Sequence, residues 1–178
     1  ATLAMAMLGD GGYSAITKAQ GDMDVMYRQN LLGNQQLGKT LYDMRSLHLH
    51  ASLALSADTP ERMQELKKLA NDYKQEFEKD WADYKAIVKD VPNPKVTELI
   101  GNIDRESADF NRDMIKIVDL KLAGQGKEAM ELYNSTGKTS ATPLHKDISD
   151  LQALSAQKAD EMNTQNGIDS TAASRNML

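Results

Sequence analysis

Two arginines, Arg105 and Arg112, stand seven residues apart in a segment with apolar residues at helical spacing. Two helical turns separate them, so both side chains project from one face of that helix. A guanidinium group binds a carboxylate through two parallel hydrogen bonds, and two such groups side by side suit a small di- or tricarboxylate. Because aspartates interleave with both arginines, a solvated, charge-paired face is the alternative. Those aspartates are Asp104, Asp109, Asp113 and Asp119.

Five further side chains complete the predicted binding site. Arg45 lies at the edge of an apolar stripe, where it either enters a pocket or extends along the surface. His48 lies on the stripe itself, where a histidine is more often a core residue than a ligand-binding one. Thr139 and Thr142 supply hydroxyls, or cap a helix that restarts before a proline. We therefore expect seven residues to contact the ligand: Arg105, Arg112, Arg45, Thr142, Thr139, His48 and Tyr133.

Residue types that other chemistries need are missing or misplaced. The chain has no cysteine, which excludes disulfides, thiolate metal sites and cysteine nucleophiles. No glutamate is followed by a histidine three residues later, so the di-iron pattern of helical bundles does not occur. His48 and His50 point to different helix faces, and no phosphate-binding or Ser-His-Asp pattern is present. We expect no enzymatic activity, no metal and no cofactor; the alternative is a haem held by His48, His145 or methionines.

The composition indicates one globular domain with an acidic surface. The 178 residues carry 21 Lys and Arg against 26 Asp and Glu, which gives a formal net charge of -5. Hydrophobic residues make up 40% of the chain but aromatic residues only 5%, so the core must be largely aliphatic. The acidic balance argues against a nucleic-acid partner. No segment contains the roughly 18 consecutive apolar residues that a transmembrane helix requires.

Apolar residues recur at three- and four-residue steps in four segments, which is typical of amphipathic helices. The breaks between them carry turn residues: an Asp or Thr cap before Pro60, two prolines within 91–94 and two glycines within 124–126. Helices are expected at 22–57, at 60–90 and between the second and third breaks. A fourth helical segment carries apolar residues from 129 to 162, with a looser stretch at 134–138 and a restart or kink at Pro143. We therefore predict an all-α, up-down-up-down antiparallel four-helix bundle about 45 Å long.

The predicted topology fixes how deep each candidate lies. The turns at 57–60 and 123–127 belong at the same end of the bundle. At 1.5 Å per residue, Arg112 lies about 16 Å below that end. Residues 45–48 of the first helix, 71–74 of the second and 138–142 of the fourth share this level, and Arg105 lies two turns deeper, near His145.

Several landmarks follow one another along the chain. The first helix contains Met-Tyr-Arg-Gln-Asn-Leu-Leu-Gly-Asn-Gln-Gln-Leu at 26–37, followed by Tyr-Asp-Met-Arg at 42–45. Trp-Ala-Asp-Tyr at 81–84 stands near the close of the second helix, and Gly-Gln-Gly-Lys-Glu-Ala at 124–129 stands at the turn into the fourth, with Pro143 beyond it. Over residues 20–175, the chain resembles the four-helix-bundle sensor domain of bacterial methyl-accepting chemotaxis proteins.

The resemblance implies the periplasmic domain of a homodimeric inner-membrane receptor, with one transmembrane helix before it and one after. It divides the chain into a membrane-proximal segment at 1–21, the bundle at 22–166 and a second membrane-proximal segment at 167–178. Such a receptor binds an attractant or repellent and displaces a helix towards the membrane. A sensor domain of a membrane histidine kinase is the alternative with the same fold.

The resemblance also bears on the ligand. Amino-acid receptors of the family use several first-helix arginines and a fourth-helix threonine across the dimer interface, whereas here only Arg45 stands in that stretch. A small organic acid held within one bundle is therefore the expected ligand. We expect a homo-oligomer, most simply a dimer whose assembly responds to ligand, and no nucleic-acid partner.

Overall fold

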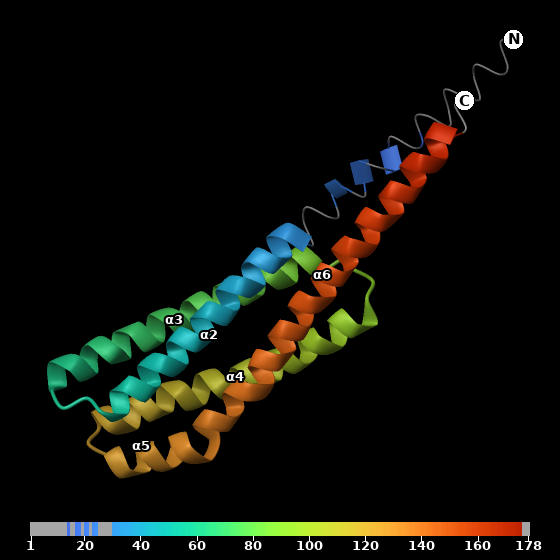
Figure 1. The fold of residues 1–178 in the computed structure, drawn as a ribbon. Helices are drawn as coiled ribbons and strands as arrows, with labels where there is room; N and C mark the ends of the chain where they lie inside the picture. The colour runs from blue at the N-terminus through green and yellow to red at the C-terminus, as the bar shows by residue number, and fades with distance from the viewer. Residues whose placement is uncertain (1–13, 15–16, 19, 22, 25–29, 176–178) are drawn as a thin grey trace, which may run out of the picture.

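The computed structural model describes residues 14, 17, 18, 20, 21, 23, 24 and 30–175. Within these residues, four helical runs lie antiparallel and no strand occurs, which confirms the predicted all-α four-helix bundle (Figure 1). The first three runs are α2 (Gly33–Leu55), α3 (Pro60–Val88) and α4 (Pro94–Leu122). The fourth consists of α5 (Gly126–Leu132), the π-helical turn η2 (Tyr133–Gly137) and α6 (Lys138–Arg175).

The helix ends follow the predicted turn chemistry. Thr59 caps α3, because its hydroxyl accepts a hydrogen bond from the Arg62 amide at 3.2 Å. Asn93 caps α4 by accepting from the amides of Lys95 and Val96 at 2.9 and 3.3 Å. The α2–α3 and α4–α5 turns lie at one end of the bundle and the α3–α4 turn at the other, as predicted (Figure 1).

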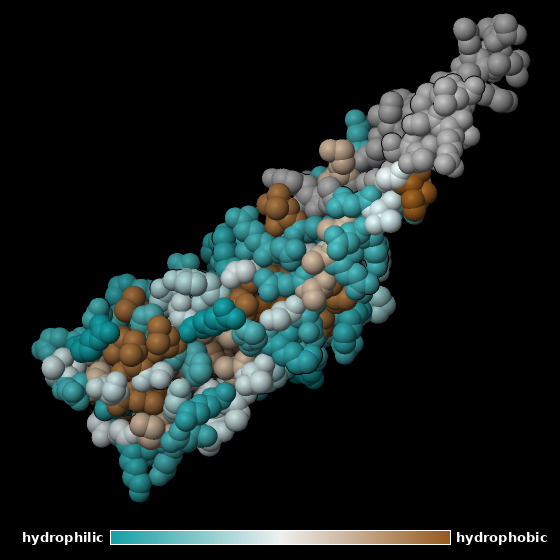
Figure 2. All heavy atoms as spheres, viewed as in Figure 1, coloured by the Kyte–Doolittle hydropathy of each residue, from teal (hydrophilic) through white to brown (hydrophobic). Residues whose placement is uncertain are grey.

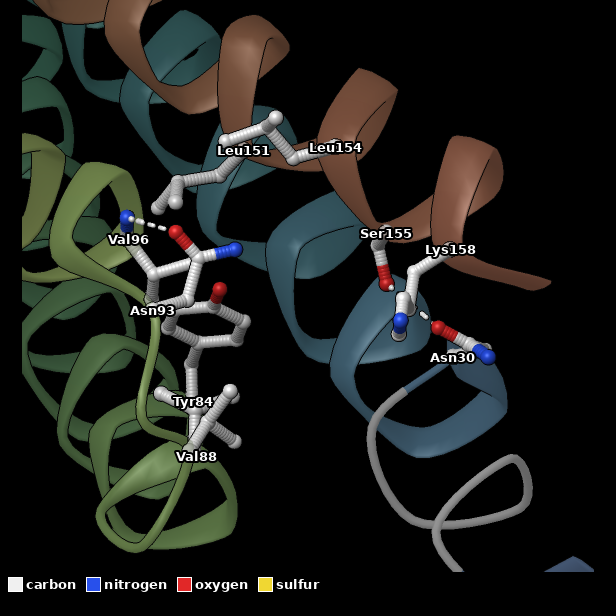
Figure 3. A pocket seen from close by; sticks show the side chains of 10 residues that line it. Asn30, Tyr84, Val88, Asn93, Val96, Leu151, Leu154, Ser155 and Lys158 are labelled. Carbon is white, nitrogen blue, oxygen red and sulfur yellow. Dashed lines mark hydrogen bonds between the residues drawn. The ribbon is translucent and has the colours of Figure 1, made fainter. Parts of the chain in front are cut away.

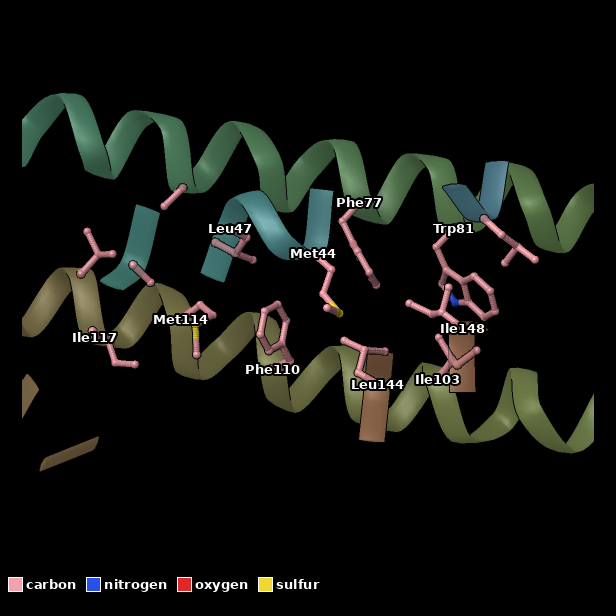
Figure 4. Close-up of a cluster of buried hydrophobic side chains, with 14 of the residues drawn as sticks. Met44, Leu47, Phe77, Trp81, Ile103, Phe110, Met114, Ile117, Leu144 and Ile148 are labelled. Carbon is pink, nitrogen blue, oxygen red and sulfur yellow. The ribbon is translucent and has the colours of Figure 1, made fainter. Parts of the chain in front are cut away.

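The core is aliphatic with a few large rings. Each of α2, α3, α4 and α6 contributes side chains that are almost completely buried, and Figure 4 shows them meeting along the bundle axis. Phe77 and Phe110 are 1% and 0% exposed, and Trp81 is 4% exposed. The Trp81 Nε1 atom donates to Asp104 Oδ1 at 2.7 Å, which joins α3 to α4 and satisfies the polar atom of the largest core side chain.

The fourth helical run differs from the prediction. The predicted restart at Pro143 is wrong, because Pro143 lies inside the continuous helix α6. The irregularity lies earlier, at η2, which overlaps the looser stretch predicted at 134–138, and α5 leaves η2 in a different direction from α6 (Figure 1). Gly137 ends η2 where a Cβ atom would lie 3.0 Å from Ile117 Cδ1 and 3.3 Å from Met114 Cε. The absence of a side chain therefore lets η2 approach α4 closely.

The outside of the bundle is mostly polar, with some exposed apolar side chains. Figure 2 shows charged and polar residues over much of the visible face, with hydrophobic side chains gathered over part of α2. Tyr42 and Leu49 on α2 expose 60% and 55% of their surface, and Leu31, two residues before α2, exposes 61%. Among the helices that the structure describes, none is both long enough and apolar enough to cross a membrane.

Candidate functional site

The structure places Arg105 and Arg112 on the exposed side of α4. Arg112 donates from Nη1 to Asp109 Oδ1 at 2.7 Å, and from Nη2 and Nε to Asp113 Oδ1 at 3.0 and 3.1 Å. These bonds, chiefly those to Asp113, raise the pKa of the Arg112 guanidinium. Arg105 donates to Asn102 at 2.7 Å. Arg112 therefore lies on a solvated, charge-paired face, which is the alternative to a binding site, and its guanidinium group already binds two carboxylates.

Other predicted residues do come together, where α2 meets η2 and α6. Arg45 Nη2 lies 2.7 Å from His145 Nε2, a contact between residues one hundred positions apart in sequence. One turn further along α2, the His48 ring lies 5.8 Å from the Tyr133 ring, measured between centroids. The Lys138 ammonium lies 5.4 Å from the centre of the same tyrosine ring. These five residues, Arg45, His48, Tyr133, Lys138 and His145, form what we call the Arg45 cluster.

The Arg45 cluster is cationic and lacks acidic partners. Within the described part of the chain, no carboxylate lies within ion-pair distance of Arg45, Lys138 or His145. Arginine has no acceptor atom, so the Arg45 contact requires His145 Nε2 to be unprotonated. A bound carboxylate would accept hydrogen bonds from Arg45 in place of His145. The cluster therefore has the donors and the charge that an organic anion needs.

His48 is not a satisfied core histidine. Its ring is half-buried between Tyr133 and Phe110, with its centroid 6.2 Å from that of Phe110. Its Nε2 atom is buried and has no hydrogen-bond partner among the described residues. Burial lowers the pKa of His48 from its ordinary value of 6.5, so the imidazole is neutral at pH 7. The fold thus leaves a buried polar atom of this neutral ring without a partner among the described residues.

The two predicted threonines have different surroundings. Thr139 Oγ1 donates to the carbonyls of Ser135 and Thr136, each at 3.2 Å, and so holds carbonyls of the π-helical turn. Thr142 is exposed on α6, three residues before His145, and its hydroxyl shares a helix face with the histidine. Only Thr142 therefore extends the Arg45 cluster.

Two members of the Arg45 cluster, Lys138 and His145, are not among the seven site residues predicted from the sequence. Lys138 and His145 stand seven residues apart, and that spacing places them on one face of α6 with Thr142 between them. The same argument applied to α4 selects Arg105 and Arg112. Spacing alone finds residues on a shared face, but it does not tell which faces have carboxylates within reach.

A cavity among the described residues lies elsewhere, under the α3–α4 turn (Figure 3). Its volume is about 50 Å³, and its walls include Tyr84, Val88 and Leu151, with Asn30 and Lys158 at one side. None of the seven predicted site residues lines it. Ligand pockets typically measure about 300 Å³ or more, so this cavity is too small for a tricarboxylate.

The residues that the structure describes contain no group of three or more His, Asp or Glu side chains that would hold a metal ion. No di-iron or similar cluster is therefore assigned to this part of the bundle, and the functional argument rests on the Arg45 cluster.

Comparison with known proteins places the chain in a family. The sequence profile of one family, described as a four helix bundle sensory module for signal transduction, matches residues 1–167. No curated protein and no solved structure matches the chain. The profile covers nearly all of the bundle, including the Arg45 cluster and the α2–α3 and α4–α5 turns. The chain therefore belongs to the family of four-helix-bundle sensory modules found in methyl-accepting chemotaxis proteins.

Proposed function

We propose that this module is the periplasmic ligand-binding domain of a transmembrane chemoreceptor, and that its ligand is a small di- or tricarboxylate bound at the Arg45 cluster. The observation that carries the proposal is the group of cationic side chains without acidic partners around Tyr133. One carboxylate would pair with the Arg45 fork, and a second would accept from Lys138. The ligand is bound and released unchanged, and it changes the balance between two helix arrangements.

The site spans the first and fourth helical runs, which suits signal transmission. Arg45 belongs to α2, whereas Lys138 and His145 belong to α6. A ligand that binds both helices favours the arrangement in which its contacts with both are made, in proportion to its differential affinity. A small displacement of α6 relative to α2 is therefore the expected output.

The same face of α2 supports association with a second copy of the chain. Leu31, Tyr42 and Leu49 are exposed along it, and Arg45 lies between Tyr42 and Leu49 at one-turn spacing. Pairing α2 with α2 of a partner would bury these apolar side chains and bring two Arg45 clusters close together. A homodimer whose association responds to ligand is therefore part of the proposal.

The test is isothermal titration calorimetry of the 178-residue chain with di- and tricarboxylates, monocarboxylates and amino acids. We expect binding of at least one di- or tricarboxylate, and a loss of at least tenfold in affinity in Arg45→Ala, since a hydrogen bond to a charged group contributes about 1.5–3 kcal/mol. Arg62→Ala is the matched control, because Arg62 is exposed and pairs with Glu65 at 2.6 Å.

Two further variants separate the Arg45 cluster from the α4 arginines. If Arg105→Ala and Arg112→Ala lose affinity while Arg45→Ala retains it, the ligand binds on α4 and the assignment to the Arg45 cluster is wrong. If none of the tested acids binds the folded protein, the ligand class itself is wrong.

A further inference from the structure

Four carboxylates lie at the middle of the bundle, one from each helical run. Asp43, Asp80 and Asp147 are 4%, 6% and 9% exposed, and Glu106 has a buried Oε2 atom. Three of the acids directly precede core residues that Figure 4 shows, namely Met44, Trp81 and Ile148. The acids therefore lie along one stretch of the core, where carboxylates are uncommon.

The first pair lies between α2 and α3. Asp43 Oδ2 is buried and has no hydrogen-bond partner among the described residues. Asp80 and Glu76, both on α3, act on Asp43 with like charge, and Lys39 of its own helix opposes them. Tyr73 is a further titratable neighbour on α3. Asp43 is thus a buried acid with two acidic neighbours and an unpartnered oxygen.

Asp80 receives little compensation from its own helix. Its Oδ1 atom lies 3.5 Å from the ammonium of Lys79, which makes a closer contact of 2.9 Å with Asp83. The side chain of Lys79 is 70% exposed, so its charge is well screened by water. The α2–α3 contact therefore contains two buried carboxylates without a buried cation.

The second pair lies between α4 and α6. Glu106 Oε2 is buried without a partner, and Asp147 of α6 acts on Glu106 with like charge. Arg105 on the same helix and Lys146 on α6 oppose this effect. Lys146 also pairs with Asp150 at 2.6 Å, and its side chain is 69% exposed. The arrangement thus repeats that of the first pair, on the other half of the bundle.

Both pairs favour the protonated form of one member. Burial, and then the charges of Asp80 and Glu76, raise the pKa of Asp43 from 3.8 to about 6. Burial, and then the charge of Asp147, raise the pKa of Glu106. A protonated carboxyl can donate a hydrogen bond to a neighbouring carboxylate, whereas two ionised carboxylates in a buried contact repel each other.

We propose that the domain binds protons at the Asp43–Asp80 and Glu106–Asp147 pairs, and that proton binding holds α2 against α3 and α4 against α6, which makes pH a second input to this sensory module. Deprotonation adds charge to both helix contacts and loosens them. The proposal is independent of the organic-acid site, because neither pair includes a residue of the Arg45 cluster.

The first experiment follows proton binding directly. The carboxyl carbon of Asp43 is observed by carbon-13 NMR in the 178-residue protein between pH 3.5 and 8, without any organic acid, and is assigned from the resonance that Asp43→Asn removes. We expect a titration midpoint near 6. A midpoint near the ordinary aspartate value of 3.8 overturns the proposal.

The second experiment follows the helices. Because the chain has no cysteine, two introduced cysteines carry spin labels without interference. Gln35 of α2 and Gln75 of α3 are exposed and uncharged, and so suit this labelling. We expect the label separation, measured by double electron–electron resonance, to change between pH 5 and pH 7.5. The change should disappear in Asp43→Asn and persist in Asp90→Asn, whose parent side chain is 89% exposed.

A label separation that is the same at both pH values overturns the conformational part of the proposal, whatever the NMR result. The same holds if Asp43→Asn retains the full change. Labels at the exposed residues Ala108 of α4 and Ala153 of α6, with Glu106→Gln as the variant, repeat the test for the second pair. If Asp43→Asn does not fold, the midpoint in the unsubstituted protein and its label separation still decide the outcome.

Discussion

His48 is held half-buried between two rings, and its charge state depends on folding. Its pKa is lowered in the folded protein, so near and below pH 6.5 the unfolded chain holds more protons than the folded one. The free energy of unfolding should therefore fall as the pH is lowered through this range. In His48→Phe, which keeps a ring between Tyr133 and Phe110, this part of the pH dependence should be lost.

The measurement is urea denaturation of both proteins at pH 7.5 and at pH 5.5. Comparison with Asp43→Asn separates the two buried groups, because their contributions have opposite signs. Because the pKa of Asp43 is raised on folding, its protonation stabilises the fold at low pH, and this stabilisation is lost as the pH rises towards 6. The lowered pKa of His48 has the opposite effect and destabilises the fold at low pH. An identical pH dependence in His48→Phe and the unsubstituted protein would contradict the burial of a neutral imidazole.

Arg45 and Arg112 show how far sequence reasoning reaches at single residues. The carboxylates that bind Arg112 are one and three positions away, so the sequence contains the charge-paired alternative, and local chemistry decides it. The partner of Arg45 is one hundred positions away and becomes a neighbour only when α6 packs beside α2. The position of Arg45 at the edge of the core-facing apolar stripe marks it as a candidate binding residue, but the identity of its partner depends on how α6 is aligned with α2.

At the scale of elements, the local sequence predicts where a helix begins, but it does not predict how closely two helices pack. Thr59 before Pro60 gives α3 the predicted cap and first-turn proline, and that start is confirmed. Asn93 lies in the predicted break at 91–94 and caps α4, a role that the sequence pattern does not predict. The looser stretch predicted at 134–138 overlaps the π-helical turn η2, but the close approach of Gly137 to α4 depends on tertiary packing. Proline usually disrupts helices, which is why Pro143 predicts a restart or a kink, yet α6 does not restart there.

Gly137 provides a test of the η2–α4 contact. An alanine there would gain about 1 kcal/mol in helix propensity, but its Cβ atom would lie 3.0–3.3 Å from Ile117 and Met114, both 0% exposed. Because these core side chains have little space to move, we expect Gly137→Ala to lower the free energy of unfolding by about 1–3 kcal/mol. The measurement is chemical denaturation at pH 7.5.

Gly101 is the matched control for this substitution. It is exposed within α4, and a Cβ atom there would meet nothing within 4 Å. Gly101→Ala should therefore raise the free energy of unfolding by about 0.5–1 kcal/mol through propensity alone. Equal stabilisation by both substitutions would show that η2 does not need its close approach to α4.

At the scale of the whole molecule, the proposed dimer links ligand binding to association through the exposed apolar side chains of α2. Leu49 is 55% exposed and follows Arg45 by one helical turn, so a partner chain that covers Leu49 also approaches the Arg45 cluster. Burying a leucine contributes about 1.5–3 kcal/mol, and a symmetric dimer buries it twice. Leu49→Ser should therefore raise the dimer dissociation constant at least tenfold while leaving the monomer folded, as measured by analytical ultracentrifugation and circular dichroism. Met130→Ser, on α5 and 43% exposed, is the control and should change association little.

Because coupling between two equilibria is reciprocal, a ligand that strengthens association binds the dimer more tightly than the monomer, and so it should bind the Leu49→Ser protein more weakly at equal chain concentration. Weakened association with unchanged ligand affinity would mean that the exposed apolar side chains of α2 join two chains without taking part in sensing. Unchanged association would place the interface on another face.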